Sequence, residues 1–272
     1  MIVFESANMK LHAISDGSFA LDGGLMYGVV PKSFWQKWHD VDAENRIRLG
    51  VWCLVAETRE GLVVVDTGCG DKLSEKLRGI YDLQRPEGDL IEGMKAEGLS
   101  PDDVVAVIQS HLHFDHCGGV TKKSDSGWAL QFPNATVYST STEYAEATLI
   151  NERTKGSYYK HTLEGWEPGE RLKLLDGETE ILPGVRAIPS PGHTLGHQLV
   201  LFDDAGMRLV YWGDLIPMST FTHIPVIASI DNYPMVTLER KKEFLKRAAE
   251  EKWHQFFCHN FGSPYSEPPA AG

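Results

Sequence analysis

Three histidines and an aspartate fall within six positions of the run SHLHFDHCGG, residues 110–119. The residues before it, VVAVI at 104–108, are apolar and mostly β-branched, which is typical of a buried strand. The two glycines that close the run indicate a turn. We therefore expect the cluster on a loop at the carboxyl end of a core strand, where open α/β sheets carry their chemistry.

The residue types in this cluster are those of a metal site. Imidazole and carboxylate bind first-row metals well, and zinc takes three or four such ligands. His111 and His113 alternate and can converge on one ion, whereas Asp115 and His116 project toward a second. Eleven histidines in 272 residues make a chance pair unremarkable. Four potential ligands within six positions of a strand-end loop instead predict metal binding.

Followed by two glycines, this H-x-H-x-D-H run resembles the signature of the metallo-β-lactamase-fold hydrolases. The resemblance implies three further ligands, and a candidate for each follows in the family's order. They are His193 after Pro-Gly, Asp214 after Gly, and His259 at the end of a late apolar run. The implied fold is of the α/β class, a four-layer αββα sandwich, with residues 1–272 forming a single domain.

The resemblance also implies how the ligands divide between two divalent ions. The first ion is expected on His111, His113 and His193, and the second on Asp115, His116 and His259. Asp214 would bridge them. Two ions about 3.5–4 Å apart can hold a hydroxide as the nucleophile. Asp115 is the expected catalytic group, which orients that hydroxide and passes a proton to the leaving alkoxide. Zinc is the expected metal, although iron, cobalt or manganese would accept the same ligands.

An upstream aspartate has two open interpretations. Asp66 lies in VVVDTG at 63–68, which matches an Asp-Thr-Gly of the resembled family. The resemblance implies that Asp66 orients a ligand histidine from behind. The amphipathic stretch that begins near Asp71 allows a helix-capping role equally well.

One longer stretch of the sequence indicates a particular branch of this family. DGGLMYGVVPK at 22–32 is closely similar to a segment of one branch of the quorum-quenching lactonases, which open the ring of N-acyl-homoserine lactones. We interpret residues 20–50 as an aromatic lid or a dimer contact, with a homodimer expected from the resemblance alone. Apolar side chains there are expected to hold the acyl tail of the small-molecule substrate, namely Met26, Tyr27, Phe34 and Trp35.

One feature departs from that branch. Well-known acyl-homoserine lactonases carry a tyrosine three positions after the bridging aspartate, where this chain has Pro217. His223 and Tyr27 are candidates for the missing donor. The departure keeps a phosphotriesterase of the methyl-parathion-hydrolase type open as an alternative function. A non-catalytic metal-binding or sensing module is the alternative of another class, and it predicts a degraded ligand set.

Composition excludes other classes. The chain has 26 basic and 38 acidic residues, a formal charge of −12, and no dense Lys/Arg run, so a nucleic-acid partner is not expected. No apolar run reaches 18 residues, and the first residues lack a secretory signal, so neither a membrane partner nor export is expected. Four scattered cysteines argue against a disulfide framework. These features predict a cytoplasmic protein.

Hydrophobic pattern and turn residues predict the remaining elements. Helices are expected near residues 31–39, 88–98, 141–150 and 234–250. Strands are expected at 10–17, 51–56, 62–66, 136–138, 172–175, 178–182, 185–189, 198–202, 208–212 and 254–258. Residues 151–168 are expected to form an insertion over the active face, and the tail from residue 263 to be loose.

Overall fold

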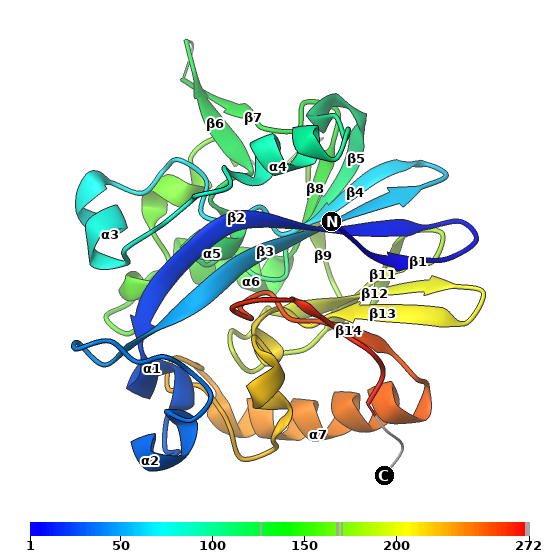
Figure 1. Cartoon of the computed structure of the whole chain (residues 1–272). Helices are drawn as coiled ribbons and strands as arrows, with labels where there is room; N and C mark the ends of the chain where they lie inside the picture. Colours follow the sequence, from blue (N-terminus) through cyan, green and yellow to red (C-terminus); the bar gives the residue numbers. More distant parts are fainter. Residues whose placement is uncertain (126, 167–168, 170, 270–272) are drawn as a thin grey trace.

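The computed structural model describes residues 1–125, 127–166, 169 and 171–269. Two β-sheets stack face to face, with helices on their outer faces (Figure 1). The predicted four-layer αββα sandwich of the α/β class is therefore confirmed. Of the expected insertion, residues 167 and 168 lie outside the described residues, as do the last three residues of the tail.

The first sheet has seven strands in the order β1-β2-β3-β4-β5-β8-β9. They are Ile2–Glu5 (β1), Lys10–Asp22 (β2), Arg46–Thr58 (β3), Gly61–Val65 (β4), Val104–Ile108 (β5), Thr136–Thr140 (β8) and Leu172–Leu175 (β9). The second sheet has six strands in sequence order, Thr179–Leu182 (β10), Val185–Pro189 (β11), Gln198–Asp204 (β12), Met207–Tyr211 (β13), His254–Phe256 (β14) and Tyr265–Ser266 (β15). A separate hairpin pairs Thr121–Ser124 (β6) with Gly127–Leu130 (β7).

The α-helices are mostly short. They are Gly23–Tyr27 (α1), Lys32–Trp35 (α2), Glu75–Ile80 (α3), Leu90–Ala96 (α4), Phe114–Cys117 (α5), Ser141–Thr148 (α6) and Pro234–Glu250 (α7). Single 3₁₀ turns occupy Pro101–Asp103 (η1), Thr154–Gly156 (η2), Lys160–Leu163 (η3), Gly213–Leu215 (η4) and Ser219–Thr222 (η5). Among the described helices, none combines the length and the apolar character that a membrane crossing requires.

Strands that are apolar on both faces hold the layers together. Val63 and Val65 of β4 point into the cluster between the sheets, which Val200 of β12 enters from the other side. Val64 points the opposite way, into the cluster that Met94 of α4 covers. Because alternate side chains of a strand face opposite sides, a run such as VVV is buried on both faces of its sheet.

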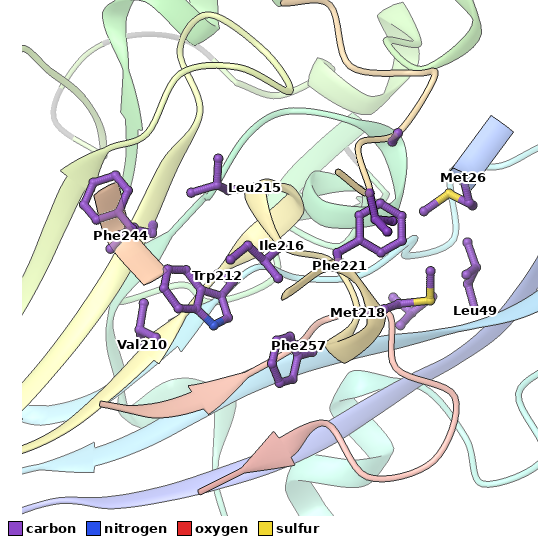
Figure 2. Close-up of a cluster of buried hydrophobic side chains, with 14 of the residues drawn as sticks. Met26, Leu49, Val210, Trp212, Leu215, Ile216, Met218, Phe221, Phe244 and Phe257 are labelled. Atoms are coloured by element: carbon purple, nitrogen blue, oxygen red, sulfur yellow. The ribbon is translucent and has the colours of Figure 1, made fainter. Parts of the chain in front are cut away.

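The apolar cluster on the outer face of the second sheet extends to the 20–50 segment. Figure 2 shows Val210 and Trp212 beside Phe244 of α7, and the same cluster continues to Met26 and Leu49. Burying a large side chain of this kind contributes about 1.5–3 kcal/mol. The cluster therefore anchors the 20–50 segment to the body of the fold.

Several expectations were wrong in extent: the strand predicted at 51–56 spans Arg46–Thr58, and the helix predicted at 31–39 is only Lys32–Trp35. The strand predicted for residues 10–17 continues to Asp22, because the pairing with β3 shifts register between Ser15 and Ser18 and passes over Gly17. Gly17 takes a φ of 108°, which few side chains tolerate, and it marks a bulge rather than an end. The tail is also less loose than predicted, because β15 pairs with β14.

Candidate metal centre

The candidate ligands all follow the carboxyl ends of strands. His111 and His113 come after β5, and His116 lies on the short helix α5 that continues the same loop. His193 lies between β11 and β12, and His259 follows β14. Asp214, on the turn η4 after β13, joins them from the second sheet. The two sheets thus contribute ligands to one point where their edges meet.

The first group of donors consists of His111, His113, His193 and Asp214, all buried. Nδ1 of His113 lies 3.0 Å from Nε2 of His111 and 3.0 Å from Nε2 of His193. Asp214 Oδ2 completes the group at 3.2 Å from His193 Nε2. The structure brings together the three histidines that the sequence assigned to the first ion.

The second group consists of His116, Asp214, Cys258 and His259. Oδ1 of Asp214 lies 3.3 Å from His116 Nε2 and 3.2 Å from His259 Nε2. Asp214 thus turns one carboxylate oxygen toward each group, as a bridging ligand must. Asp115 lies beside this group, with Oδ2 3.5 Å from His259 Nε2 and 3.7 Å from His116 Nε2. Its role as a ligand stays a prediction.

Cys258 enters the second group without having been predicted as a ligand. Its Sγ donates to Asp214 Oδ1 at 3.4 Å. Burial, reinforced by the nearby Asp214 carboxylate, raises the pKa of this thiol well above its ordinary value. In the absence of metal this thiol is therefore a hydrogen-bond donor to Asp214.

The outward nitrogens of the histidines show which inward atoms are free to bind metal. Nδ1 of His259 donates to the Gly50 carbonyl at 2.7 Å, and Nδ1 of His116 and of His193 face carboxylates at 2.7 Å and 2.8 Å. In its neutral form, each of these rings therefore carries its proton outward and presents a bare Nε2 to the centre. Several bare nitrogens around one point cannot satisfy each other, whereas a cation satisfies them all. The donor set fits divalent metal ions.

The carboxylates behind these histidines are Asp66 and Asp231. Asp66 contacts His116, and it also accepts from the Ser110 amide at 2.7 Å and from the Tyr211 hydroxyl at 2.8 Å. Helix α3 is instead capped by Ser74, so the capping interpretation of Asp66 does not hold. Asp231, which contacts His193, was missed because nothing in its local sequence marks it.

His197, which was left out of the ligand set, supports the bridging aspartate. Its Nε2 accepts a hydrogen bond from the Asp214 amide at 3.0 Å. Burial among other imidazoles lowers the pKa of His197 to about 3, so the ring stays neutral and able to accept. Gly213 has a φ of 52°, and a Cβ there would lie 2.6 Å from this nitrogen. Glycine is therefore required at 213.

Electrostatics favour the metal-binding protonation state at His111, His113 and Asp214. Burial, helped by neighbouring imidazoles, lowers the pKa of His111 and His113 well below the ordinary value, so both rings are neutral. Burial opposes ionisation of Asp214, but the histidines around it outweigh this and hold its pKa well below the ordinary value. Neutral imidazoles and an ionised carboxylate are the forms that bind metal.

A cavity of about 280 Å³ opens above the centre. Its floor includes His113, Asp115, Asp214 and His259. One wall is apolar, and it is formed by Phe19, Leu21, Leu25, Met26, Leu49 and Ile230. Polar groups in the lining come from Tyr81 and from Arg153 and Ser157 of the 151–168 segment. Such a site can hold a ligand with a polar head on the ions and an apolar tail along the wall.

Most of the residues predicted to bind the substrate do not line the cavity. Met26 lines the cavity, whereas Tyr27, the next residue, is fully buried and bonds Thr220 at 2.8 Å. Trp35 stacks on Tyr27 at 5.4 Å, and both lie outside the cavity lining. Phe34 and His223 also lie outside it and are exposed. The sequence missed Tyr81 and Arg153, which carry no motif.

Comparison with known proteins agrees with this geometry. The model of the Metallo-beta-lactamase superfamily matches residues 46–252. An N-acyl homoserine lactonase of Bacillus thuringiensis is 31% identical over 235 residues, which are 79% of this chain and 82% of that protein. The chain belongs to the metallo-beta-lactamase superfamily.

Other proteins are similar over comparable lengths. An N-acyl homoserine lactonase of Bacillus cereus is 28% identical over 218 residues, 72% of this chain and 80% of that protein. A probable metal-dependent hydrolase from Staphylococcus aureus superposes with a TM-score of 0.87 at 25% identity, over 98% of each chain. An N-acyl homoserine lactone hydrolase with N-hexanoyl-L-homoserine at its catalytic metal center superposes with a TM-score of 0.73 at 25% identity, over 94% of this chain and 95% of that one.

Proposed function

We propose that this protein is a metal-dependent hydrolase that opens the lactone ring of N-acyl-homoserine lactones. One observation carries the proposal: two groups of buried metal donors adjoin a cavity with an apolar wall, and His113, Asp214 and His259 lie on its floor. The 31% identity to a lactonase over 82% of that protein supports the choice of substrate. A non-catalytic sensing module would be expected to have lost ligands, and none of the predicted positions has been lost.

Two ions would be held by the two donor groups, with Asp214 shared between them. When bound, divalent ions at such a site supply a water of lowered pKa as nucleophile and a Lewis acid for the carbonyl. Zinc is the proposed metal because its preferred ligands are imidazole and carboxylate in sets of three or four. Asp66 and Asp231 keep His116 and His193 in the tautomer that binds metal.

Asp115 is the proposed proton carrier. Its carboxylate lies on the cavity floor within 3.7 Å of His116 Nε2, and it is the least buried carboxylate there. In this position it accepts the proton of the attacking water and delivers it to the ring oxygen when the ester bond breaks. General acid–base catalysis of this kind contributes about 10²- to 10⁴-fold.

The remaining lining residues would select the substrate. Leu21, Met26 and Ile230 on the apolar wall would take the acyl tail. Pro217 offers no side-chain donor, but Tyr81 contributes a phenol to the cavity lining. The Tyr81 and Tyr159 hydroxyls lie 2.9 Å apart, and burial together with this contact raises the pKa of Tyr81 above its ordinary value. Tyr81 therefore stays protonated and is the proposed donor to the substrate.

Two further features concern the oligomeric state and the compartment of the protein. Val29 and Phe34 of the 20–50 segment are 93% and 61% exposed, which favours a homodimer contact there, within a single domain spanning 1–272. All four cysteines are buried free thiols, which favours a reducing compartment such as the cytoplasm.

Proton release in weak buffer tests the proposed function directly, because ring opening yields an acid. The purified protein, loaded with two equivalents of Zn²⁺, is mixed with N-hexanoyl-homoserine lactone. We expect fast acid release by the wild type and loss of at least 100-fold in the Asp115→Asn variant. A silent wild type with two ions bound would overturn the lactonase assignment. Activity on a phosphotriester instead would favour the alternative.

A further inference from the structure

Glu143 is a buried carboxylate that the mechanism above does not use. It lies in the first turn of α6 and is fully buried. Its Oε1 accepts from the Leu112 amide at 2.8 Å and from the Tyr158 hydroxyl at 2.7 Å. Its Oε2 accepts from Thr194 Oγ1 at 2.5 Å. A single side chain thus joins three segments that are far apart in sequence.

Two of these segments carry the ligands of the first group. Leu112 lies between His111 and His113, and Thr194 directly follows His193. The third segment also contacts a ligand, because the Tyr158 ring packs edge-on against His113 at 4.6 Å. Glu143 therefore fixes the separation between the two loops whose histidines must meet around one ion.

The second group is held by other residues. His116 is backed by Asp66, and His259 by the Gly50 carbonyl. Within the described residues, the side chain of Glu143 makes no hydrogen bond to His116 or His259, nor to the groups behind them. The His193 loop carries a ligand of the first group only, so changing Glu143 should disturb that group more than the second.

The sequence of the His193 loop fits this close approach to α6. A Cβ at Gly196 would lie 2.1 Å from the Glu143 amide nitrogen, so only glycine lets the loop lie against the helix start. The Gly196 carbonyl accepts from Thr140 Oγ1 at 2.8 Å, and the same hydroxyl caps α6 by accepting from the Glu143 amide. The His193 loop is thus held to the start of α6 by both Thr140 and Glu143.

We propose that Glu143 is a positioning residue that sets the distance between the His111–His113 loop and the His193 loop, and so chiefly the affinity of the first metal site. This rests on the two-ion centre of the proposed function but not on its substrate. Partners behind metal ligands typically change affinity 10- to 100-fold. The expected effect is a selective loss of that size at one of the two sites.

The test is a titration of the metal-free full-length protein with Co²⁺ against a chromophoric chelator. Glu143→Asp keeps the charge but is one methylene shorter, so it cannot reach Leu112 and Thr194 together. We expect at least a 10-fold loss of affinity at one site and less than a twofold change at the other. Glu143→Gln keeps the length and an acceptor oxygen, and it should stay within threefold of the wild type at both sites.

Reference variants identify the affected site. The Co²⁺ ion that Glu143→Asp still binds tightly should give the visible spectrum of His193→Ala rather than that of His259→Ala. Val137→Ala, a buried truncation in the adjacent β8, controls for a general loss of stability and should affect neither site selectively. Equal weakening of both sites, or none, in Glu143→Asp would overturn the role of Glu143. A wild type that binds only one ion would instead overturn the two-ion centre.

Discussion

Truncation of Leu21 tests whether the apolar wall of the cavity holds the acyl tail of the substrate. Leu21 lines the cavity and is partly buried against the outer core cluster. Leu21→Ala removes three carbons, each worth about 0.8 kcal/mol when fully withdrawn from water. Because the side chain is only partly buried, we expect about half of this total, about 1 kcal/mol. That is about a fivefold loss in kcat/KM for a long-chain substrate.

The assay compares substrates as well as variants. kcat/KM is measured for N-butanoyl- and N-octanoyl-homoserine lactone by acid release at fixed metal load. The butanoyl tail is too short to gain much from the wall, so Leu21→Ala should affect only the octanoyl substrate. Leu83→Ala is the matched control, because Leu83 packs against the same cluster in the same partly buried way but lies outside the cavity lining.

Either of two results would refute this reasoning. If Leu21→Ala slows both substrates equally, the side chain supports the site as a whole and does not contact the tail. If Leu83→Ala produces the same change in chain-length preference, the effect comes from the cluster and not from the cavity wall. In both cases the tail must be sought along another wall.

Three further predictions concern metal and pH. Asp231→Asn should lower the affinity for one ion about 10- to 100-fold by removing the partner of His193, and isothermal titration with Zn²⁺ would contradict this if both affinities were unchanged. Chelation should lower the melting temperature reversibly, since an ion at 1,000 times its Kd contributes about 4 kcal/mol; calorimetry with and without restored Zn²⁺ measures this. Burial lowers the pKa of Lys241 to about 8 from 10.5, so the unfolded chain binds that proton more tightly. Urea unfolding should therefore show the wild type gaining stability relative to Lys241→Met between about pH 8 and 10.5, and a constant difference would contradict the shift.

The candidate ligands could be predicted because each one lies in a local pattern, and for His193, Asp214 and His259 the family resemblance pointed to that pattern. His111 and His113 follow an apolar strand, His193 follows a Pro-Gly turn, and Asp214 and His259 come shortly after β13 and β14. A strand end places its next few residues at the edge of the sheet whatever the rest of the chain does. The same logic predicted most strands and α7, whose bounds agree with the pattern.

The cavity walls could not be predicted in this way. An apolar or aromatic residue in the sequence indicates that its side chain is buried, but not whether the side chain lines the cavity or packs in the core. In α1, neighbouring residues diverge, since Met26 faces the cavity and Tyr27 packs beneath it against Trp35. Arg153 is held at the site by tertiary contacts, one of which joins its guanidinium to the Asp231 carbonyl at 2.9 Å, between segments 78 positions apart. Such contacts depend on tertiary packing that no local pattern records.

The carboxylates around the centre explain why metal and fold should be coupled. Asp66, Asp115, Asp214 and Asp231 are all buried, and together they carry four negative charges if ionised, which equals the charge of two divalent ions. Each donor group includes one histidine backed by a carboxylate, so both ions meet a ligand of raised basicity. Without ions, protonation of histidines between these carboxylates compensates part of their charge, as the raised pKa of His116 indicates: its burial is outweighed by Asp214, Asp115 and Asp66. We therefore expect metal binding to release protons from the centre and to neutralise buried charge that the metal-free protein keeps.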